Sequence, residues 1–258
     1  MADVITEHRG GAVWLRLNRP ERRNAYDLAM AEELTVAVRE AADAAAIVIT
    51  GSDGAFCAGG FLADLSNPEP EKLRLLFDAS LRLFDEIRNS PRPVIAAVNG
   101  AAAGGGNELV VACDFAIAAQ SAKLGQTGPR VGSAPVLGGT NLLSLSVGEK
   151  RGKEISMLCR RYTAQTAFEL GWVNAVVPDE QLEAEVDSWV EEILALSPRY
   201  LEIAKVSSNV WWNQARESYR TGLGMLMQAV GSEDMLEGAN AFMEKRRPRF
   251  RDAKEEAS

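Results

Sequence analysis

VIAAVNGAAAGGGNELVVACDFAIA, residues Val94–Ala118, is the stretch that decides the architecture of this chain. It begins with five apolar residues, Val94–Val98, the pattern of a strand buried on both faces. Small residues follow, including three consecutive glycines at 104–106, and then a helical segment, Asn107–Ala112. A second apolar run, Phe115–Ala119, predicts another strand. The stretch therefore predicts a strand, a glycine-rich loop, a helix and a strand in direct succession.

The same alternation continues toward the N-terminus. Residues Ala12–Asn18 alternate between apolar and polar, as expected for a half-exposed strand. A helix is predicted from Leu28 to about Asp43, a buried strand over Ala46–Thr50, and a second helix over Leu73–Arg88. Strands that alternate with helices predict an α/β fold.

The C-terminal part of the chain has a different character, because no strand is predicted after Leu182. Helical spacing predicts helices over Leu182–Leu196, Pro198–Asn213, Ser218–Val230 and Ser232–Glu244. We therefore divide the chain into a core, residues 1–197, and a helical oligomerisation region, residues 198–258. Trp and Met are frequent in these helices, which is typical either of ordinary core or of a subunit interface.

Composition is that of an ordinary globular protein and argues against several classes of function. Of the 258 residues, 47% are apolar and 25% are charged, which argues against disorder. The formal charge of -8 argues against a nucleic-acid partner. The N-terminal residues lack the pattern of a signal peptide, and no apolar run approaches the ~20 residues that span a bilayer. We expect a cytoplasmic protein without a membrane partner.

Two scarce residue types limit the chemistry. The single histidine, His8, removes most metal sites and histidine-based catalysis, so we expect no metal and a general base that is a carboxylate, Lys, Tyr or Cys. The three cysteines, Cys57, Cys113 and Cys159, are far apart and odd in number. That usage fits free, mostly buried thiols in a reducing compartment.

Two loops rich in small residues follow predicted strands. They are AFCAGG (Ala55–Gly60) and NGAAAGGGNEL (Asn99–Leu109). The second loop opens a helix, whose first N–H groups lack intrahelical partners and add positive potential. Two N–H donors from separate loops suit an oxyanion hole. The same glycines would equally serve tight turns and close packing.

These loops, in this order and spacing, resemble the crotonase, or enoyl-CoA hydratase/isomerase, superfamily. The resemblance covers nearly the whole chain. It extends through the strings LNRPERRNAYD, ITGSDGAFCAGG, KLGQTGPRVG, AFELGWVNAVVP and AFMEKRRPRF.

The resemblance implies a core of repeated ββα units in a spiral, a helical C-terminal region that builds trimers or hexamers, and an acyl-CoA thioester substrate. The oxyanion-hole amides fall on Gly60 and Gly105. Glu108 matches the first glutamate of the hydratases and is the expected proton-transfer residue. No cofactor is expected, because CoA is part of the substrate.

The second hydratase glutamate has no counterpart, because Gly128 stands at its position. The string GQTGPRVG looks instead like the branch of 1,4-dihydroxy-2-naphthoyl-CoA synthase and 2-ketocyclohexanecarboxyl-CoA hydrolase. In that branch the glycine leaves space for bicarbonate or another external base. Ser133 matches the branch, whereas Pro135 and Val230 replace its aspartate and its C-terminal tyrosine.

Further substrate contacts follow from the same resemblance. Ala58 and Phe61 belong to the first loop. Phe61 replaces an aspartate that is common in the superfamily. It either lines a drier acyl pocket or only packs in the wall of the pocket. Arg22 lies in the turn expected near CoA. Phe242 and Lys245 match positions that reach the CoA site of a neighbouring subunit. The alternative is that Arg22 and Lys245 are solvated surface cations and that Phe242 packs in the core.

The resemblance thus predicts hydration or isomerisation of an enoyl-CoA. The alternative is C–C hydrolysis of a cyclic β-ketoacyl-CoA or a naphthoate-synthase-like ring reaction. A third hypothesis, of a different class, is a non-catalytic acyl-CoA binder or an RNA-binding member of the fold.

Overall fold

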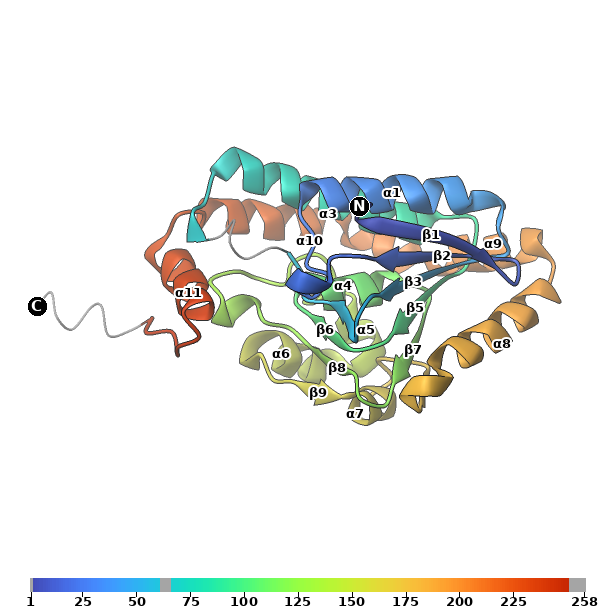
Figure 1. Ribbon diagram of the computed structural model, residues 1–258. Helices are drawn as coiled ribbons and strands as arrows, with labels where there is room; N and C mark the ends of the chain where they lie inside the picture. The colour runs from blue at the N-terminus through green and yellow to red at the C-terminus, as the bar shows by residue number, and fades with distance from the viewer. Residues whose placement is uncertain (1, 61–65, 251–258) are drawn as a thin grey trace, which may run out of the picture.

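The computed structural model of this chain describes residues 2–60 and 66–250. A six-stranded sheet has the order β1-β2-β3-β5-β7-β10, and a four-stranded sheet has the order β4-β6-β8-β9 (Figure 1). The large sheet contains β1 (Val4–Arg9), β2 (Ala12–Leu17), β3 (Ala46–Gly51), β5 (Val94–Val98), β7 (Phe115–Ala119) and β10 (Ala175–Val177). The small sheet contains β4 (Ala55–Cys57), β6 (Ala101–Ala103), β8 (Lys123–Gly125) and β9 (Tyr162–Thr163).

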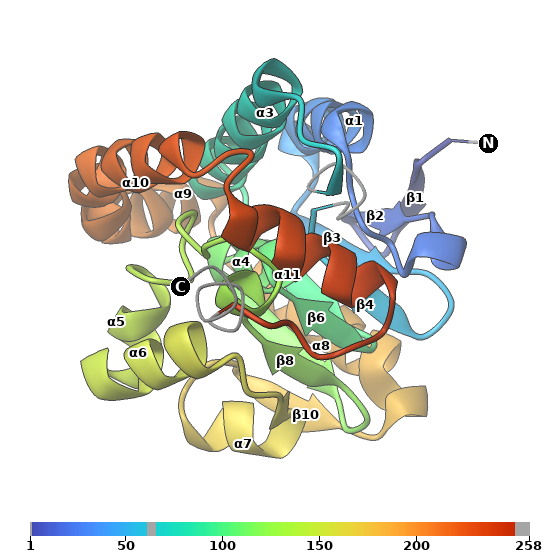
Figure 2. The same cartoon turned by 90° about the vertical axis from the view of Figure 1, so that its left-hand side faces the viewer.

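Consecutive strands of each unit enter different sheets. β3, β5 and β7 are parallel neighbours in the large sheet, and β4, β6 and β8, which follow them in the chain, are parallel neighbours in the small one. Figure 2 shows β4, β6 and β8 side by side. The repetition of one strand pair per turn confirms the expected crotonase-like spiral and the α/β class.

The central strands are buried on both faces, as their sequences predict. Ile47 and Ile49 of β3 pack in the main core with α1 (Leu28–Glu40) and α3 (Pro70–Asn89), whereas Val48 faces α8 (Leu182–Leu194). Helix α1 begins where the Asp27 side chain accepts a hydrogen bond from the Met30 N–H at 3.1 Å. The large sheet therefore lies between a helical layer on each face (Figure 1).

The C-terminal helices are α9 (Pro198–Ser208), α10 (Val210–Gln228) and α11 (Glu233–Met243). The predicted helix boundary between residues 213 and 218 is wrong. The boundary between α9 and α10 lies at Asn209, whose side chain donates a hydrogen bond to the Arg88 carbonyl. Trp212 and Tyr219 consequently lie on one helix, with ring centroids 4.8 Å apart and both side chains buried. Along the described ranges, no helix is both long and apolar enough to cross a membrane.

A buried ion pair attaches α9 to the core. Lys205 Nζ lies 2.7 Å from an Asp114 carboxylate oxygen and donates to the carbonyls of Ile87 and Arg92, each at 2.8 Å. The Lys205 side chain is 5% exposed and that of Asp114 is 16% exposed.

Replacing Lys205 by Ala is expected to reduce the free energy of unfolding by about 3–5 kcal/mol. The largely buried Asp114 carboxylate loses its cation and keeps only the Val94 N–H, and two carbonyls lose a donor. Urea unfolding followed by circular dichroism measures the change. The matched control is Lys153→Ala, which removes an exposed pair with Glu149 and is expected to cost less than about 1 kcal/mol. Equal losses in both variants would contradict this role for Lys205.

Candidate active site

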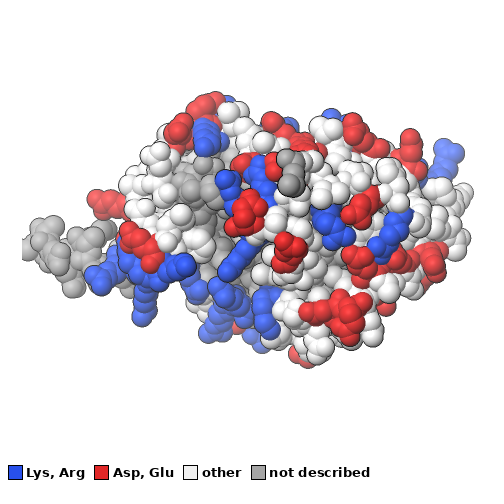
Figure 3. Space-filling view, in the orientation of Figure 1, with Lys and Arg blue, Asp and Glu red and all other residues white. Residues whose placement is uncertain are grey.

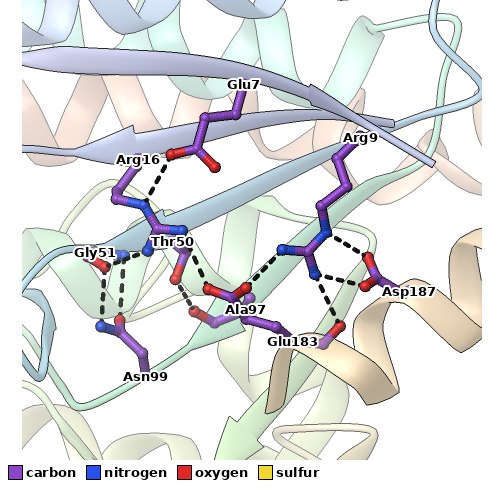
Figure 4. Close-up of polar contacts among 9 residues, drawn as sticks. All are labelled: Glu7, Arg9, Arg16, Thr50, Gly51, Ala97, Asn99, Glu183 and Asp187. Carbon is purple, nitrogen blue, oxygen red and sulfur yellow. Dashed lines mark hydrogen bonds and ion pairs between the residues drawn. The ribbon is translucent and has the colours of Figure 1, made fainter. Parts of the chain in front are cut away.

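The carboxyl ends of β3 and β5 are tied together, and this fixes where both small-residue loops begin. Asn99 Oδ1 accepts from the Gly51 N–H at 3.1 Å, and Asn99 Nδ2 donates to the Gly51 carbonyl at 2.9 Å (Figure 4). Thr50 Oγ1 donates to the Ala97 carbonyl at 2.9 Å. Since the strands are parallel, the loops that leave them start on the same edge of the sheet.

The two loops then pack backbone against backbone. A Cβ on Gly106 would lie 2.0 Å from the Cys57 carbonyl oxygen, and a Cβ on Gly59 would lie 2.9 Å from the Gly105 nitrogen. Gly59 also has a φ of 94°, which favours glycine. Only glycine fits this contact, so close packing explains Gly59 and Gly106. The same contact brings residues 59–60 against the start of α4 (Gly105–Ala112).

The amides of Gly60 and Gly105 have no hydrogen-bond acceptor within the described part of the chain. Gly60 forms a parallel bridge with Tyr26, in which the Tyr26 N–H donates to the Gly59 carbonyl at 2.9 Å. The bridge therefore leaves the Gly60 N–H free. Gly105 is the first residue of α4, where an N–H has no intrahelical partner. Both nitrogens are available to an external oxygen.

Glu108 lies one turn further along α4 and is held from one side. Its Oε1 accepts from the N–H groups of Leu137, at 2.7 Å, and Gly139, at 3.2 Å. Oε2 has no protein partner among the described residues. Burial raises the pKa of Glu108 to about 7. The hydrogen bonds from the two N–H groups lower the pKa, but burial has the larger effect. A carboxyl group with such a pKa exchanges protons readily near neutral pH.

These groups face one pocket of about 90 Å³. Six of the predicted site residues line it, namely Ala58, Gly60, Gly105, Glu108, Gly128 and Ser133. Its apolar wall includes Leu73, Leu76 and Phe77 of α3, and α10 contributes Leu226. The pocket is thus built by segments from both halves of the chain. Phe61 lies outside the described residues.

Gly128 is packed against a neighbouring loop. A Cβ there would lie 2.9 Å from the Ala134 Cα and 3.0 Å from both Pro135 Cδ and the Ser133 carbonyl oxygen. Close packing against the loop of Ser133, Ala134 and Pro135 therefore explains why residue 128 is a glycine. The bicarbonate expected beside Gly128 stays a prediction. The space that a Cβ would fill is occupied by that loop, so the ion would have to lie in the pocket.

The three residues predicted to contact CoA lie outside the pocket lining. Arg22 is exposed in the turn that leads to Tyr26, Phe242 is 55% exposed on α11, and Lys245 is exposed just beyond that helix. Near α11, basic side chains gather on one part of the surface although the whole chain is acidic (Figure 3). A groove there is lined by Arg130, Arg246 and Arg247.

Polar side chains of the pocket that the sequence did not indicate are Tyr26, Ser80, Gln126 and Thr127. Gln126 is fully buried, and neither its amide nitrogen nor its oxygen has a partner in the described structure. A signal existed for Ser80, because it is a polar residue on the otherwise apolar face of α3.

Comparisons with known proteins agree with this architecture. The enoyl-CoA hydratase/isomerase family matches residues 7–254. An enoyl-CoA hydratase structure from Bacillus anthracis is 35% identical, with a TM-score of 0.79, covering 96% of this chain and 99% of that one. An enoyl-CoA hydratase from Mycobacterium avium subsp. paratuberculosis is 26% identical, with a TM-score of 0.88 and coverage of 97% and 99%.

The ββα spiral with its buried carboxylate is that of a crotonase-superfamily enzyme. With the family match across residues 7–254, the chain belongs to the enoyl-CoA hydratase/isomerase family. The particular branch that contains naphthoyl-CoA synthase has no specific support from these matches.

Proposed function

We propose that this enzyme hydrates or isomerises an enoyl-CoA thioester. The observation that carries the proposal is the buried Glu108, with one oxygen held by two N–H groups and the other unpartnered among the described residues, in a pocket that also contains the free amides of Gly60 and Gly105. In this proposal the thioester oxygen accepts hydrogen bonds from both amides. Charge that develops on this oxygen is stabilised there as an enolate.

Glu108 then moves the proton. In hydration, the Glu108 carboxylate takes a proton from water while the water oxygen bonds to the β-carbon, and the C=C electron pair shifts toward the thioester. The protonated Glu108 returns that proton to the α-carbon, so the net change is addition of water. In isomerisation, Glu108 removes a proton at one carbon and delivers it two carbons away. One carboxyl group suffices for either sequence.

The CoA contacts and the assembly belong to the same proposal. Arg22 and the basic surface near α11 offer charge for the CoA phosphates. Several large apolar side chains of the C-terminal helices are exposed, and they are Tyr200, Ile203, Trp211, Met225, Phe242 and Met243. Exposed apolar surface of this kind supports a homotrimer or a dimer of trimers, in which Phe242 and Lys245 approach a neighbouring CoA site. A cytoplasmic location is proposed with it.

The test compares two substrates with the purified protein. Loss of crotonyl-CoA with formation of 3-hydroxybutyryl-CoA, followed by mass spectrometry, is the expected result. Ring opening of 2-ketocyclohexanecarboxyl-CoA without crotonyl-CoA hydration would favour the C–C hydrolase, which the single carboxylate also permits. Binding of both thioesters without conversion would overturn the proposal in favour of a non-catalytic binder.

A further inference from the structure

Tyr26 connects the two loops that carry the free amides. Its main chain is bonded to the first loop through the Gly59 carbonyl. Its side chain crosses to the second loop, where a Cβ on Gly105 would lie 2.4 Å from the phenol oxygen. The Tyr26 hydroxyl therefore lies against the Gly105 Cα, which is the atom bonded to the free nitrogen of that residue.

The Tyr26 hydroxyl also has a polar neighbourhood inside an apolar pocket. It lies near the Ser80 side chain, whose hydroxyl donates to the Leu76 carbonyl at 2.8 Å, and near the Glu108 carboxyl group, which lines the same pocket. Tyr26 is 6% exposed and Ser80 is 1% exposed, and both line the pocket beside Leu73, Leu76 and Phe77. The Ser80 hydroxyl has its partner in the Leu76 carbonyl. Phe in place of Tyr26 would fill the same space without burying a hydroxyl group, whose desolvation is unfavourable, so packing alone does not explain the phenol.

The position of the hydroxyl corresponds to one part of a bound thioester. When the carbonyl oxygen lies at Gly60 and Gly105, the carbons next to the carbonyl lie near Glu108, which has to exchange protons with them. An oxygen on the third acyl carbon is in a 1,3 relationship to the thioester oxygen, and the two oxygens lie close together when the bonds between the first three carbons place both on the same side. A donor and acceptor adjacent to Gly105 can reach the oxygen on the third carbon.

We propose that the Tyr26 hydroxyl binds an oxygen substituent on the third carbon of the acyl group, and so selects 3-oxygenated acyl-CoA thioesters as substrate or product. This inference rests on the function proposed above. Burial raises the pKa of Tyr26, so the phenol stays protonated at working pH and can both donate and accept. A 3-hydroxyl group can do the same, so it finds a partner whichever way the phenol proton points.

The experiment compares the binding of two thioesters that differ in one oxygen. Butyryl-CoA and each enantiomer of 3-hydroxybutyryl-CoA are titrated calorimetrically into the full chain carrying Glu108→Gln, which prevents conversion during the measurement. Tyr26→Phe is then added to that background. We expect Tyr26→Phe to raise the Kd of the better-bound enantiomer of 3-hydroxybutyryl-CoA by about fivefold to tenfold. The Kd of butyryl-CoA is expected to stay within about twofold of its value in the parent.

Two further variants separate recognition from packing. Tyr219→Phe removes another buried tyrosine hydroxyl, one outside the pocket lining and without a described partner, and is expected to change neither affinity. Ser80→Ala removes a pocket hydroxyl that is bonded to the Leu76 carbonyl, and is expected to leave the ratio of the two affinities within about twofold. Equal weakening of both thioesters by Tyr26→Phe, or no weakening of either, would overturn the inference. Failure of the Glu108→Gln parent to bind either thioester would overturn the proposed function itself.

Discussion

Glu108→Gln is expected to lower kcat by about 10²–10⁴-fold while leaving the affinity for butyryl-CoA within about threefold. The amide retains an oxygen that can accept from the Leu137 and Gly139 N–H groups, so the loop that holds the side chain keeps its anchor. It cannot take up or release a proton. The loss is therefore expected in the chemical step, and single-turnover conversion of crotonyl-CoA measures it directly.

A control is available on the surface. Glu149→Gln changes an exposed glutamate that pairs with a lysine one turn along the same helix, and its effect on kcat is expected to be less than about twofold. Turnover by Glu108→Gln within a factor of about three of the parent would refute proton transfer by this residue.

The pH dependence follows from the same burial. Because burial raises the pKa of Glu108 to about 7, the carboxylate form that accepts the proton of water increases as the pH rises through about 7. We expect kcat/KM for crotonyl-CoA hydration to rise across that range. The residual activity of Glu108→Gln is expected to lack this inflection. A profile flat between pH 6 and pH 8, roughly one unit on each side of that pKa, would contradict the assignment.

The contribution of Glu108 to the free energy of unfolding falls as the pH rises, whereas the activity rises. The folded state binds the Glu108 proton more tightly than the unfolded chain does, because the pKa is about 7 instead of 4.5. The contribution of this group to the free energy of unfolding is therefore largest below about pH 4.5 and is lost as the pH rises toward 7. The full difference is worth about 3 kcal/mol. Glu108→Gln avoids this loss, so its stability relative to the parent should increase from pH 5 to pH 8 in urea titrations.

Much of the fold was predictable because local sequence and tertiary environment agree. The β-branched run of β3 and the apolar run of β5 are bounded by turn residues, and α3 carries an apolar stripe. The small sheet was not predictable in this way. Strands β4 and β6 have three residues each, and β6 consists of alanine. Their extended conformation depends on pairing with one another and with β8, which local propensity does not report.

The candidate active site was likewise predictable only in part. Gly60, Gly105 and Glu108 were predicted from the resemblance to the crotonase superfamily, and the structure brings all three to one pocket. Tyr26 was not predicted to line the pocket, because its phenol reaches Gly105, a residue far along the chain, and the sequence around Tyr26 does not indicate that contact. The break at Asn209 was missed for a similar reason. Asn209 ends a helix by bonding to the Arg88 carbonyl on α3, a partner that only the folded chain supplies.

Replacing the Gly60 amide by an ester is expected to lower kcat/KM by about 10²–10³-fold, because it removes one N–H donor without adding a side chain. The substitution is made by incorporating glycolic acid at position 60. It is suited to Gly60, whose N–H is not used in the bridge with Tyr26, so no protein hydrogen bond of the described chain loses its donor. The Gly59 carbonyl, which accepts from the Tyr26 N–H, becomes an ester carbonyl and thus a weaker acceptor, but it is retained. An ester at Gly54, in the exposed turn before the same loop, is the matched control.

Exchange of the α-protons of butyryl-CoA in D₂O isolates the step in which the amide acts. This substrate has no double bond to hydrate, so the exchange reports enolate formation alone and needs both the amide donors and the Glu108 base. The Gly60 ester is expected to slow exchange about as much as turnover, while the Gly54 ester leaves both unchanged. Slowed turnover with undiminished exchange would mean that the Gly60 N–H does not stabilise the enolate, and the charge would then have to rest on Gly105 and the positive end of α4 alone.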